Sequence, residues 1–324
     1  MPAFGLLTYK AHPEYNVGDY IQSLAAARFL PQVDQYVNRE KLSKYNGEKL
    51  KLILNGWFMH HPENWPPSEQ IDPLLISFHL NAQAREAMLS DAGTRWFKEH
   101  GPVGCRDLYT QEALNSVGID TWLSGCLTTT LKNKWNYRTN DIYFVDVLFR
   151  VPDWKTMGRS TRGFARSLLS GDWLKGSQRE TLMKRLFTED ILKTARQLTH
   201  YHPSRHTEQE RFEMAESFLE KYATARLVIT SRLHCALPCL AFGTPVIFVE
   251  AGFNQEQEWC RLNGITQNFN TITVQPDSSI SSNFHFNGAV GADISIENPT
   301  AFRQYVPALE EKCYLFVNAV SEGV

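Results

Sequence analysis

The sequence lacks a strong charge of either sign and a long unbroken hydrophobic run. Its formal net charge is −2 over 324 residues. Proteins that bind nucleic acid usually present a basic surface, so we do not expect nucleic acid as the main partner. The longest apolar stretch, within residues 225–249, is interrupted by Arg232, His234, Gly243 and Pro245. We therefore expect no integral membrane segment.

We expect no secretory leader, and the cysteines form no motif. The first residues, MPAFGLLTYK, have no charged region followed by the apolar core of a secretory signal. The six cysteines are scattered, which is typical of a reduced intracellular chain. Cys235 and Cys239 lie four residues apart, but nothing completes a metal site, so core packing is favoured. These features predict a cytoplasmic protein with no metal.

What is present is an alternation of short apolar runs with helical patterns, which predicts α/β domains with doubly wound parallel sheets. The polar segment 131–140 has no apolar period and is typical of a linker. We expect an N-terminal α/β domain at 1–135, a second α/β domain at 136–270, and a C-terminal extension with a closing helix at 271–324. Two Rossmann-like domains would then face each other across a cleft, the usual place for a ligand.

The most informative segment begins at Ala225 and reads ARLVITSRLHCALPCLAFGTPVIFV. Its first part, Arg226 to Ile229, is an apolar and β-branched run that predicts a buried strand. Thr230 and Ser231 are residue types that cap helix N-termini. The helix that follows is expected to end at Gly243, before a second apolar strand. The segment therefore predicts a complete strand–helix–strand unit.

Two residues that suit anions stand where the first strand of this unit leads into the helix. Arg232 and His234 lie at the carboxyl edge of the predicted parallel sheet, where α/β proteins bind ligands. A guanidinium and an imidazole beside a helix N-terminus form a site for an anion. The structural alternative is that Arg232 is an ion-pair partner and His234 a capping residue. Both residues together favour the ligand site.

Three motifs in this order resemble the polysaccharide pyruvyl transferase family. The first is Asn16-Val17-Gly18-Asp19 with Gln22, and the second is Arg106-Asp107 before a predicted helix. The third and most specific is Thr230-Ser231-Arg232-Leu233-His234, followed by Gly243-Thr244-Pro245. The resemblance covers the chain from about Phe4 to Val249.

The sequence departs from the family pattern at two places. Asn55-Gly56-Trp57 replaces a glycine-rich turn, and Ser124-Gly125-Cys126 replaces an Asp-Pro pair that many members carry. The first departure leaves the acceptor side of the cleft open to a different substrate.

The resemblance implies a two-domain fold like that of GT-B glycosyltransferases. It also implies transfer of pyruvate from phosphoenolpyruvate to a sugar as a ketal, with release of phosphate and without a cofactor. The sugar acceptor is open, and a lipid-linked acceptor with peripheral membrane association is one alternative.

The residues then fall into three candidate roles. Arginine suits a ligand with a carboxylate and a phosphate, and histidine suits proton transfer near neutral pH. The catalytic candidates are His234 and Asp19, although Asp19 also fits a capping role. The donor-binding candidates are Arg106, Arg232, Ser231 and Leu233. The candidates for acceptor or phosphate contacts are His79, Asn16, Asn55, His200 and His202.

Three features leave other interpretations open. Glu250 lies at the end of the predicted strand after Pro245 and suits the ribose of a nucleotide sugar, so a glycosyltransferase of the same fold is an alternative. The altered turn at Asn55 is also compatible with a non-catalytic carbohydrate-binding relative. The basic segment from Arg150 to Arg166 is interpreted as a solvated surface rather than a loop over an anionic donor. Separately, His60 and His61 are expected to face solvent, and the alternative is that they line the sugar site.

Overall fold

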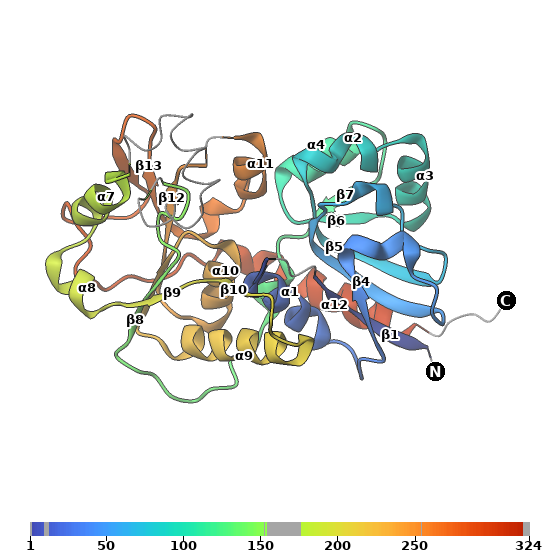
Figure 1. The fold of residues 1–324 in the computed structure, drawn as a ribbon, viewed down its shortest axis with the longest axis horizontal. Helices are drawn as coiled ribbons and strands as arrows, with labels where there is room; N and C mark the ends of the chain where they lie inside the picture. Colours follow the sequence, from blue (N-terminus) through green and yellow to red (C-terminus); the bar gives the residue numbers. More distant parts are fainter. Residues whose placement is uncertain (1, 10–12, 152, 154–175, 254, 320–324) are drawn as a thin grey trace.

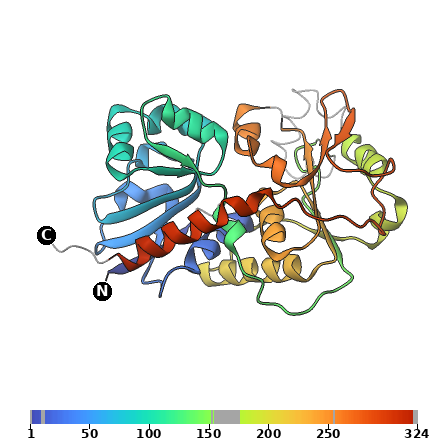
Figure 2. The ribbon, with the colours of Figure 1, turned by 180° about the vertical axis from the view of Figure 1, so that it is seen from behind.

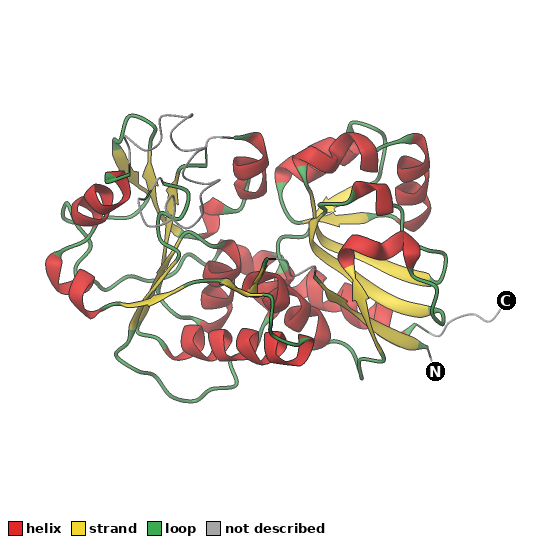
Figure 3. Cartoon of the chain, viewed as in Figure 1, coloured by secondary structure: helices red, strands yellow, loops and turns green. Residues whose placement is uncertain are grey.

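The computed structural model describes residues 2–9, 13–151, 153, 176–253 and 255–319. The basic segment at 150–166 therefore falls almost entirely outside the described residues. Two six-stranded sheets lie side by side, each with helices around it (Figures 1 and 3). The prediction of α/β architecture with parallel sheets is confirmed. The segment 131–140 contains no helix or strand and leads from one sheet to the other, and the domain boundaries remain a prediction.

The first sheet is built from the N-terminal half of the chain, and all of its strands are parallel. Its strand order is β3 (Gln35–Asn38), β1 (Ala3–Thr8), β4 (Leu50–Phe58), β5 (Ile71–Leu80), β6 (Val103–Cys105) and β7 (Thr121–Leu123). The helices that follow β5 and β6 are α2 (Arg85–Met88), α3 (Asp91–His100) and α4 (Leu108–Asn115).

The second sheet is parallel except for its edge strand β14, which pairs antiparallel with β13. Its strand order is β14 (Ile280–Ser282), β13 (Asn270–Val274), β12 (Val246–Ala251), β11 (Leu227–Thr230), β8 (Ile142–Val145) and β9 (Arg196–Leu198). The helices α7 (Gln178–Leu186) and α8 (Glu189–Thr194) connect β8 to β9, and the short helix α11 (Glu256–Trp259) follows β12.

The two sheets share one topology. In each sheet, the strand that comes first in the sequence lies between the strands that come second and third. The strand order therefore reverses beside β1 in the first sheet and beside β8 in the second. Open α/β sheets bind ligands at this reversal, outside the carboxyl ends of the strands. The residues that follow β1, β4, β8 and β11 are therefore placed to line a site.

Elements from the two halves of the sequence interlock between the sheets. The short strand β2 (Glu14–Asn16) pairs antiparallel with β10 (Tyr201–Pro203). Next to it, α1 (Val17–Ala27) packs against α9 (Glu208–Thr224) and α10 (Leu233–Phe242) of the C-terminal half. A single hydrophobic core runs from the first sheet into α9 and α10. The neighbouring strands β9 and β10 belong to different sheets, although only two residues separate them.

The strand–helix–strand unit at 225–249 is β11, α10 and β12. Gly243 ends α10 in the left-handed conformation, with φ 69°, as a helix C-cap should. The expected N-cap is wrong, because Arg232 is the N-cap residue and its side chain makes no capping hydrogen bond. The Thr230 hydroxyl instead donates to the Val145 carbonyl and accepts from the Arg232 amide.

The last helix, α12 (Val306–Asn318), crosses back from the second sheet to the first, as Figure 2 shows. Lys51 of β4 is buried and fixes the helix end, because its Nζ donates to the carbonyls of Phe316 (2.7 Å) and Ala319 (2.6 Å). The closing helix predicted from the sequence is therefore packed on the N-terminal half. No helix in the described ranges is long and apolar enough to cross a bilayer.

Replacing Lys51 with Met should destabilise the protein, since two helix-end carbonyls lose a charged donor. Hydrogen bonds to charged groups contribute about 1.5–3 kcal/mol, so we expect a loss of about 2–3 kcal/mol in the free energy of unfolding, measured in urea. Lys312→Met is the matched control, since Lys312 is exposed on the same helix. Equal losses in the two variants would show that Lys51 does not anchor α12.

Candidate functional site

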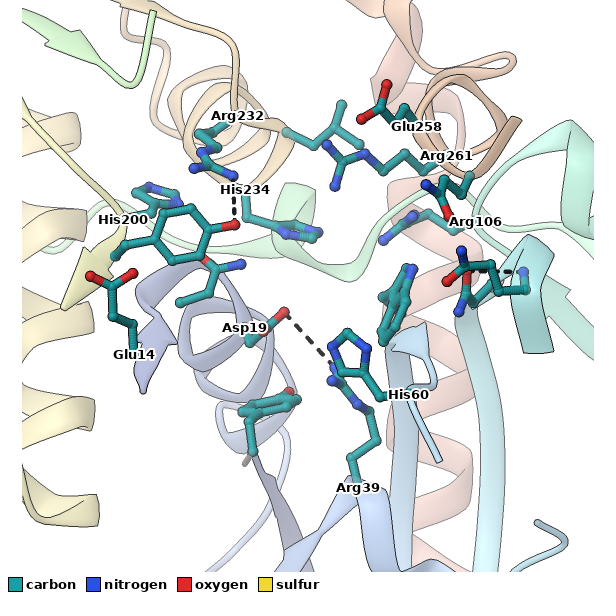
Figure 4. Close-up of a pocket in the computed structure, with 18 of the residues that line it drawn as sticks. Glu14, Asp19, Arg39, His60, Arg106, His200, Arg232, His234, Glu258 and Arg261 are labelled. Carbon is teal, nitrogen blue, oxygen red and sulfur yellow. Dashed lines mark hydrogen bonds and ion pairs between the residues drawn. The ribbon is translucent and has the colours of Figure 1, made fainter. Parts of the chain in front are cut away.

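A pocket of about 360 Å³ lies between the carboxyl edges of the two sheets. It is lined by Tyr9, Arg39 and Trp57 from the ends of β1, β3 and β4, and by Arg150 and the start of α10 from the second half. Tyr9, Trp57 and the start of α10 lie at the ends of β1, β4 and β11, which are strands beside the two reversals. Figure 4 shows Arg106, Arg232 and Arg261 around His234, with Asp19, His60 and Arg39 on the opposite side.

Arg232 is fixed at the N-terminus of α10. Its Nε donates to Asp146 at 2.8 Å, and its guanidinium lies over the ring of Phe149, 3.6 Å from the centroid, and 4.5 Å from that of Tyr201. The second terminal nitrogen, Nη2, is buried without a hydrogen-bond partner among the described residues. Arg232 thus has a fixed orientation and a free donor.

His234 stands in the first turn of α10, where the helix is kinked (φ −81°, ψ 15°). Its Nε2 is enclosed and has no hydrogen-bond partner in the part of the chain that the structure describes. Burial lowers the pKa of His234 well below its ordinary value, and the positive charges of Arg106 and Arg261 lower it further. The imidazole is therefore neutral at pH 7 in the empty pocket, with a ring nitrogen available to a ligand.

Two further arginines complete the positive side of the pocket. Arg106 follows β6 and is 2% exposed, with its Nε 3.4 Å from Asp107. Arg261 comes from a short 3-10 helix, Cys260–Leu262, and its Nε is buried without a hydrogen-bond partner among the residues described. Burial lowers the pKa of Arg261 to about 10, helped by Arg150, Arg232 and Arg106. A group of cations that repel one another in a buried pocket binds an anion favourably.

The opposite side has a different character. Arg39 is 3% exposed and lies 2.9 Å from Glu40 and 3.9 Å from Asp19. Its guanidinium is held between two rings, 4.8 Å from the centroid of Tyr9 and 5.1 Å from that of Trp57. Burial raises the pKa of Asp19, although the charge of Arg39 opposes the increase. This side of the pocket is aromatic, and its charges are balanced.

Most of the residues singled out from the sequence converge on this pocket. Asn16 caps α1, accepting from the Gly18 amide at 3.0 Å. His200 is buried, with Nε2 2.7 Å from the Tyr222 hydroxyl, and burial and Arg232 lower its pKa to about 3. The sequence-predicted residues that line the pocket are Asn16, Asp19, Arg106, His200, Arg232, Leu233 and His234.

Four other candidates lie behind or beside the described pocket lining, each held by neighbours. Ser231 is bonded on both sides, because its hydroxyl donates to the Val249 carbonyl and accepts from the Leu148 amide. Asn55 is buried and donates to the Gln22 carbonyl at 2.9 Å. His202 contacts the Thr199 carbonyl through Nε2 at 3.0 Å.

His79 is the fourth of these residues, and it is buried rather than at the surface. Its Nδ1 lies 2.6 Å from Asp107, and its Nε2 faces the Cys260 sulfur at 3.9 Å. Burial raises the pKa of Asp107, but His79 and Arg106 outweigh this and hold it below its ordinary value. His79 and Asp107 therefore support the backbone that carries Arg106.

Several pocket residues escaped the sequence reasoning. His60 is exposed, as expected, and also lines the pocket. Glu250 of the nucleotide-sugar alternative lies in β12, apart from the described lining. Arg39 follows β3 and Trp57 lies near the end of β4, and that position was their one available signal. Arg261 lies in a short helix after α11 and had no such signal. The described residues hold no group of three or more His, Cys, Asp or Glu side chains that suits a metal.

Comparison with known proteins agrees with the motifs. None of the proteins with curated descriptions matches the chain. The family model described as polysaccharide pyruvyl transferase matches residues 16–251. That match covers well over half of the chain, from the capping residue of α1 to the end of β12, and includes Arg106, Arg232 and His234. The chain belongs to the polysaccharide pyruvyl transferase family.

Proposed function

We propose that the protein transfers pyruvate from phosphoenolpyruvate to a sugar, forms a cyclic ketal and releases phosphate. Membership of the family supports pyruvyl transfer in general. The assignment of phosphoenolpyruvate as the donor substrate rests on one observation. Arg106, Arg232 and Arg261 are buried together around His234 in one pocket. Phosphoenolpyruvate presents a carboxylate and a phosphate close together, and arginine forks bind both groups in a bidentate manner.

The unpaired N–H groups of these arginines favour a small dianion as the substrate that donates pyruvate. Arg232 Nη2 and Arg261 Nε are buried without hydrogen-bond partners within the described ranges, whereas Arg106 Nε lies 3.4 Å from the Asp107 carboxylate. Leaving such groups unpaired costs about 1–3 kcal/mol each, so a ligand that satisfies them binds with that advantage. The N-terminus of α10 adds oriented amides for the phosphate.

His234 would supply the proton that starts the reaction. The proton adds to the methylene carbon, which becomes the methyl group, and the adjacent carbon becomes cationic. A sugar hydroxyl attacks this carbon, the bond from carbon to the phosphate oxygen breaks, and a second hydroxyl closes the ring. Of the two hydroxyl protons, one replaces the proton taken by the methyl group, and the other leaves on phosphate. The reaction therefore needs no oxidant or cofactor.

Binding of phosphoenolpyruvate should be coupled to proton uptake by His234. In the empty pocket its pKa lies well below the ordinary value, mainly through burial and then through Arg106 and other cationic neighbours. A bound anion cancels the repulsion and raises this pKa, so affinity should fall as pH rises between the two values. Calorimetry in buffers of different ionisation enthalpy measures the uptake. His234→Gln subtracts the titration of the ligand, and equal uptake in this variant would contradict the assignment.

We also propose that the two sheets are the two domains of a GT-B-like fold, divided near residue 135. The shared strand order and the pocket between the carboxyl edges support this division. Under this proposal the donor is held by residues from both domains, Arg106 from one and Arg232 from the other.

The function is tested by ligand stabilisation and by turnover. Phosphoenolpyruvate should raise the thermal unfolding temperature in a concentration-dependent way, and UDP should not. Incubation with phosphoenolpyruvate and a panel of galactosyl or mannosaminyl acceptors should then release phosphate. Stabilisation by UDP and consumption of a nucleotide sugar, without phosphate release from phosphoenolpyruvate, would assign the protein to glycosyl transfer instead.

A further inference from the structure

We propose that the wall formed by Tyr9, Asp19, Arg39, Trp57 and His60 is the acceptor subsite, and that it binds an uncharged pyranoside with Asp19 as the proton acceptor. This inference rests on the proposed function and names the second substrate of the same pocket. All five side chains line the pocket on the side of the first sheet. Figure 4 shows Asp19, His60 and Arg39 across from Arg232 and Arg261.

The charge balance of this wall separates it from the donor side. Arg39 is the one arginine among these five residues, and Glu40 and Asp19 lie 2.9 Å and 3.9 Å from it. Arg106 also follows a strand of the first sheet, but it belongs to the arginine group around His234. Glu14 adds a further carboxylate to the pocket lining. The carboxylates offset the charge of Arg39 and offer acceptors to hydroxyl groups, and Arg39 Nη1, buried without a hydrogen-bond partner among the described residues, offers a donor. The wall fits an uncharged, hydroxyl-rich ligand.

Trp57 supplies a rigid apolar surface for a sugar ring. It lies near the end of β4, where the strand still pairs with β5, and it is half-buried. The Arg39 guanidinium lies 5.1 Å from its ring centroid, and the His60 ring centroid lies 4.4 Å from it. Aromatic side chains that are held in this way give a large contact area at low entropic cost, while their polar edge remains wet. Trp57 also belongs to the turn in which the sequence departs from the family, so its presence here is a property of this chain.

Asp19 lies where a proton must be accepted. It is in the first turn of α1, and a Cβ on its neighbour Gly18 would come within 3.2 Å of the His234 Cβ. Asp19 and His234 therefore approach the same part of the pocket from two helices. The Asp19 carboxylate is oriented by the Gln22 amide, which donates to its Oδ1 at 3.2 Å. The Asp19 carboxylate accepts the proton of the hydroxyl that attacks the cationic carbon.

The pocket has room for both substrates. Its volume of about 360 Å³ exceeds what phosphoenolpyruvate alone requires and lies in the range of pockets that enclose larger ligands. With the donor on the arginines beside His234, the remaining space borders Trp57 and Asp19. The pyranoside would offer two hydroxyls that a single carbon can bridge.

Two variants separate binding of the sugar from the chemistry. Trp57→Ala should raise the KM for the sugar about 10-fold, through lost aromatic contact, and leave the affinity for phosphoenolpyruvate within a factor of about two. Asp19→Asn should lower kcat about 10²- to 10⁴-fold with the affinity for phosphoenolpyruvate again retained. Trp259→Ala is the matched control, since Trp259 is exposed on α11. Thermal unfolding of each variant confirms that it is folded.

The probes are methyl galactoside, methyl N-acetylmannosaminide and a blocked galactoside, methyl 2,3-di-O-methyl-4,6-O-benzylidene galactoside, in which no hydroxyl is free. Turnover of an open pyranoside but not the blocked one, with the KM effect confined to Trp57→Ala, supports the subsite. Phosphoenolpyruvate binding by the wild-type protein without binding or turnover of either pyranoside would overturn it. A failure to bind phosphoenolpyruvate at all would refute the proposed function instead. An unchanged kcat in Asp19→Asn would remove Asp19 from the proton transfer.

Discussion

Replacing His234 by Gln should lower kcat about 10²- to 10⁴-fold, the usual contribution of a positioned acid or base. Its Nε2 is enclosed without a hydrogen-bond partner in the described structure, so the loss of this nitrogen leaves no other group without a partner. Three arginines remain to hold the donor, so the Kd of phosphoenolpyruvate should change by less than about tenfold, as measured by calorimetry.

His202→Gln is the matched control for this substitution. His202 is half-exposed on β10 and bonded to the Thr199 carbonyl, so its replacement should leave both kcat and Kd unchanged. If His234→Gln keeps wild-type kcat, another group delivers the proton. A change in Kd alone would make His234 a binding residue rather than an acid.

Replacing Arg261 by Gln should raise the Kd of phosphoenolpyruvate about 10- to 100-fold. Hydrogen bonds to charged groups contribute about 1.5–3 kcal/mol, and each 1.4 kcal/mol is a tenfold change in affinity. No described carboxylate forms an ion pair with Arg261, and its buried Nε has no hydrogen-bond partner there. The substitution therefore removes a repulsive charge from the empty pocket and should not lower the free energy of unfolding.

Arg150→Gln tests whether any pocket arginine would give the same result. Arg150 also lines the pocket, but Glu258 neutralises it at 3.0 Å. Its replacement should change the Kd less than Arg261→Gln does. Equal effects would show that general charge governs binding, and no effect of Arg261→Gln would remove that residue from the donor site.

Local signals in the sequence were sufficient for the unit from β11 to β12. The β-branched run before Thr230 and the glycine at position 243 determine its boundaries, because both act within a few residues. The prediction of the N-cap was wrong because the Thr230 and Ser231 hydroxyls donate hydrogen bonds to carbonyls of neighbouring strands. Strand pairing is not a local property of the sequence.

Some residues of the candidate site could likewise be predicted from local sequence, and others could not. Arg232 and His234 follow a recognisable strand and carry a motif, so their position at the sheet edge could be predicted. Arg261 belongs to a short helix beyond the matched family region, and the packing that brings it to His234 involves residues far apart in sequence. His79 could not be placed, because its burial depends on a carboxylate 28 positions away, at Asp107.

A crystal structure of the protein with phosphoenolpyruvate tests the central claim most directly. The account predicts that the phosphate and carboxylate oxygens contact Arg106, Arg232 and Arg261, and that the methylene carbon lies next to His234 Nε2. Phosphoenolpyruvate bound elsewhere, or bound in the pocket with its methylene carbon turned away from His234, would contradict it.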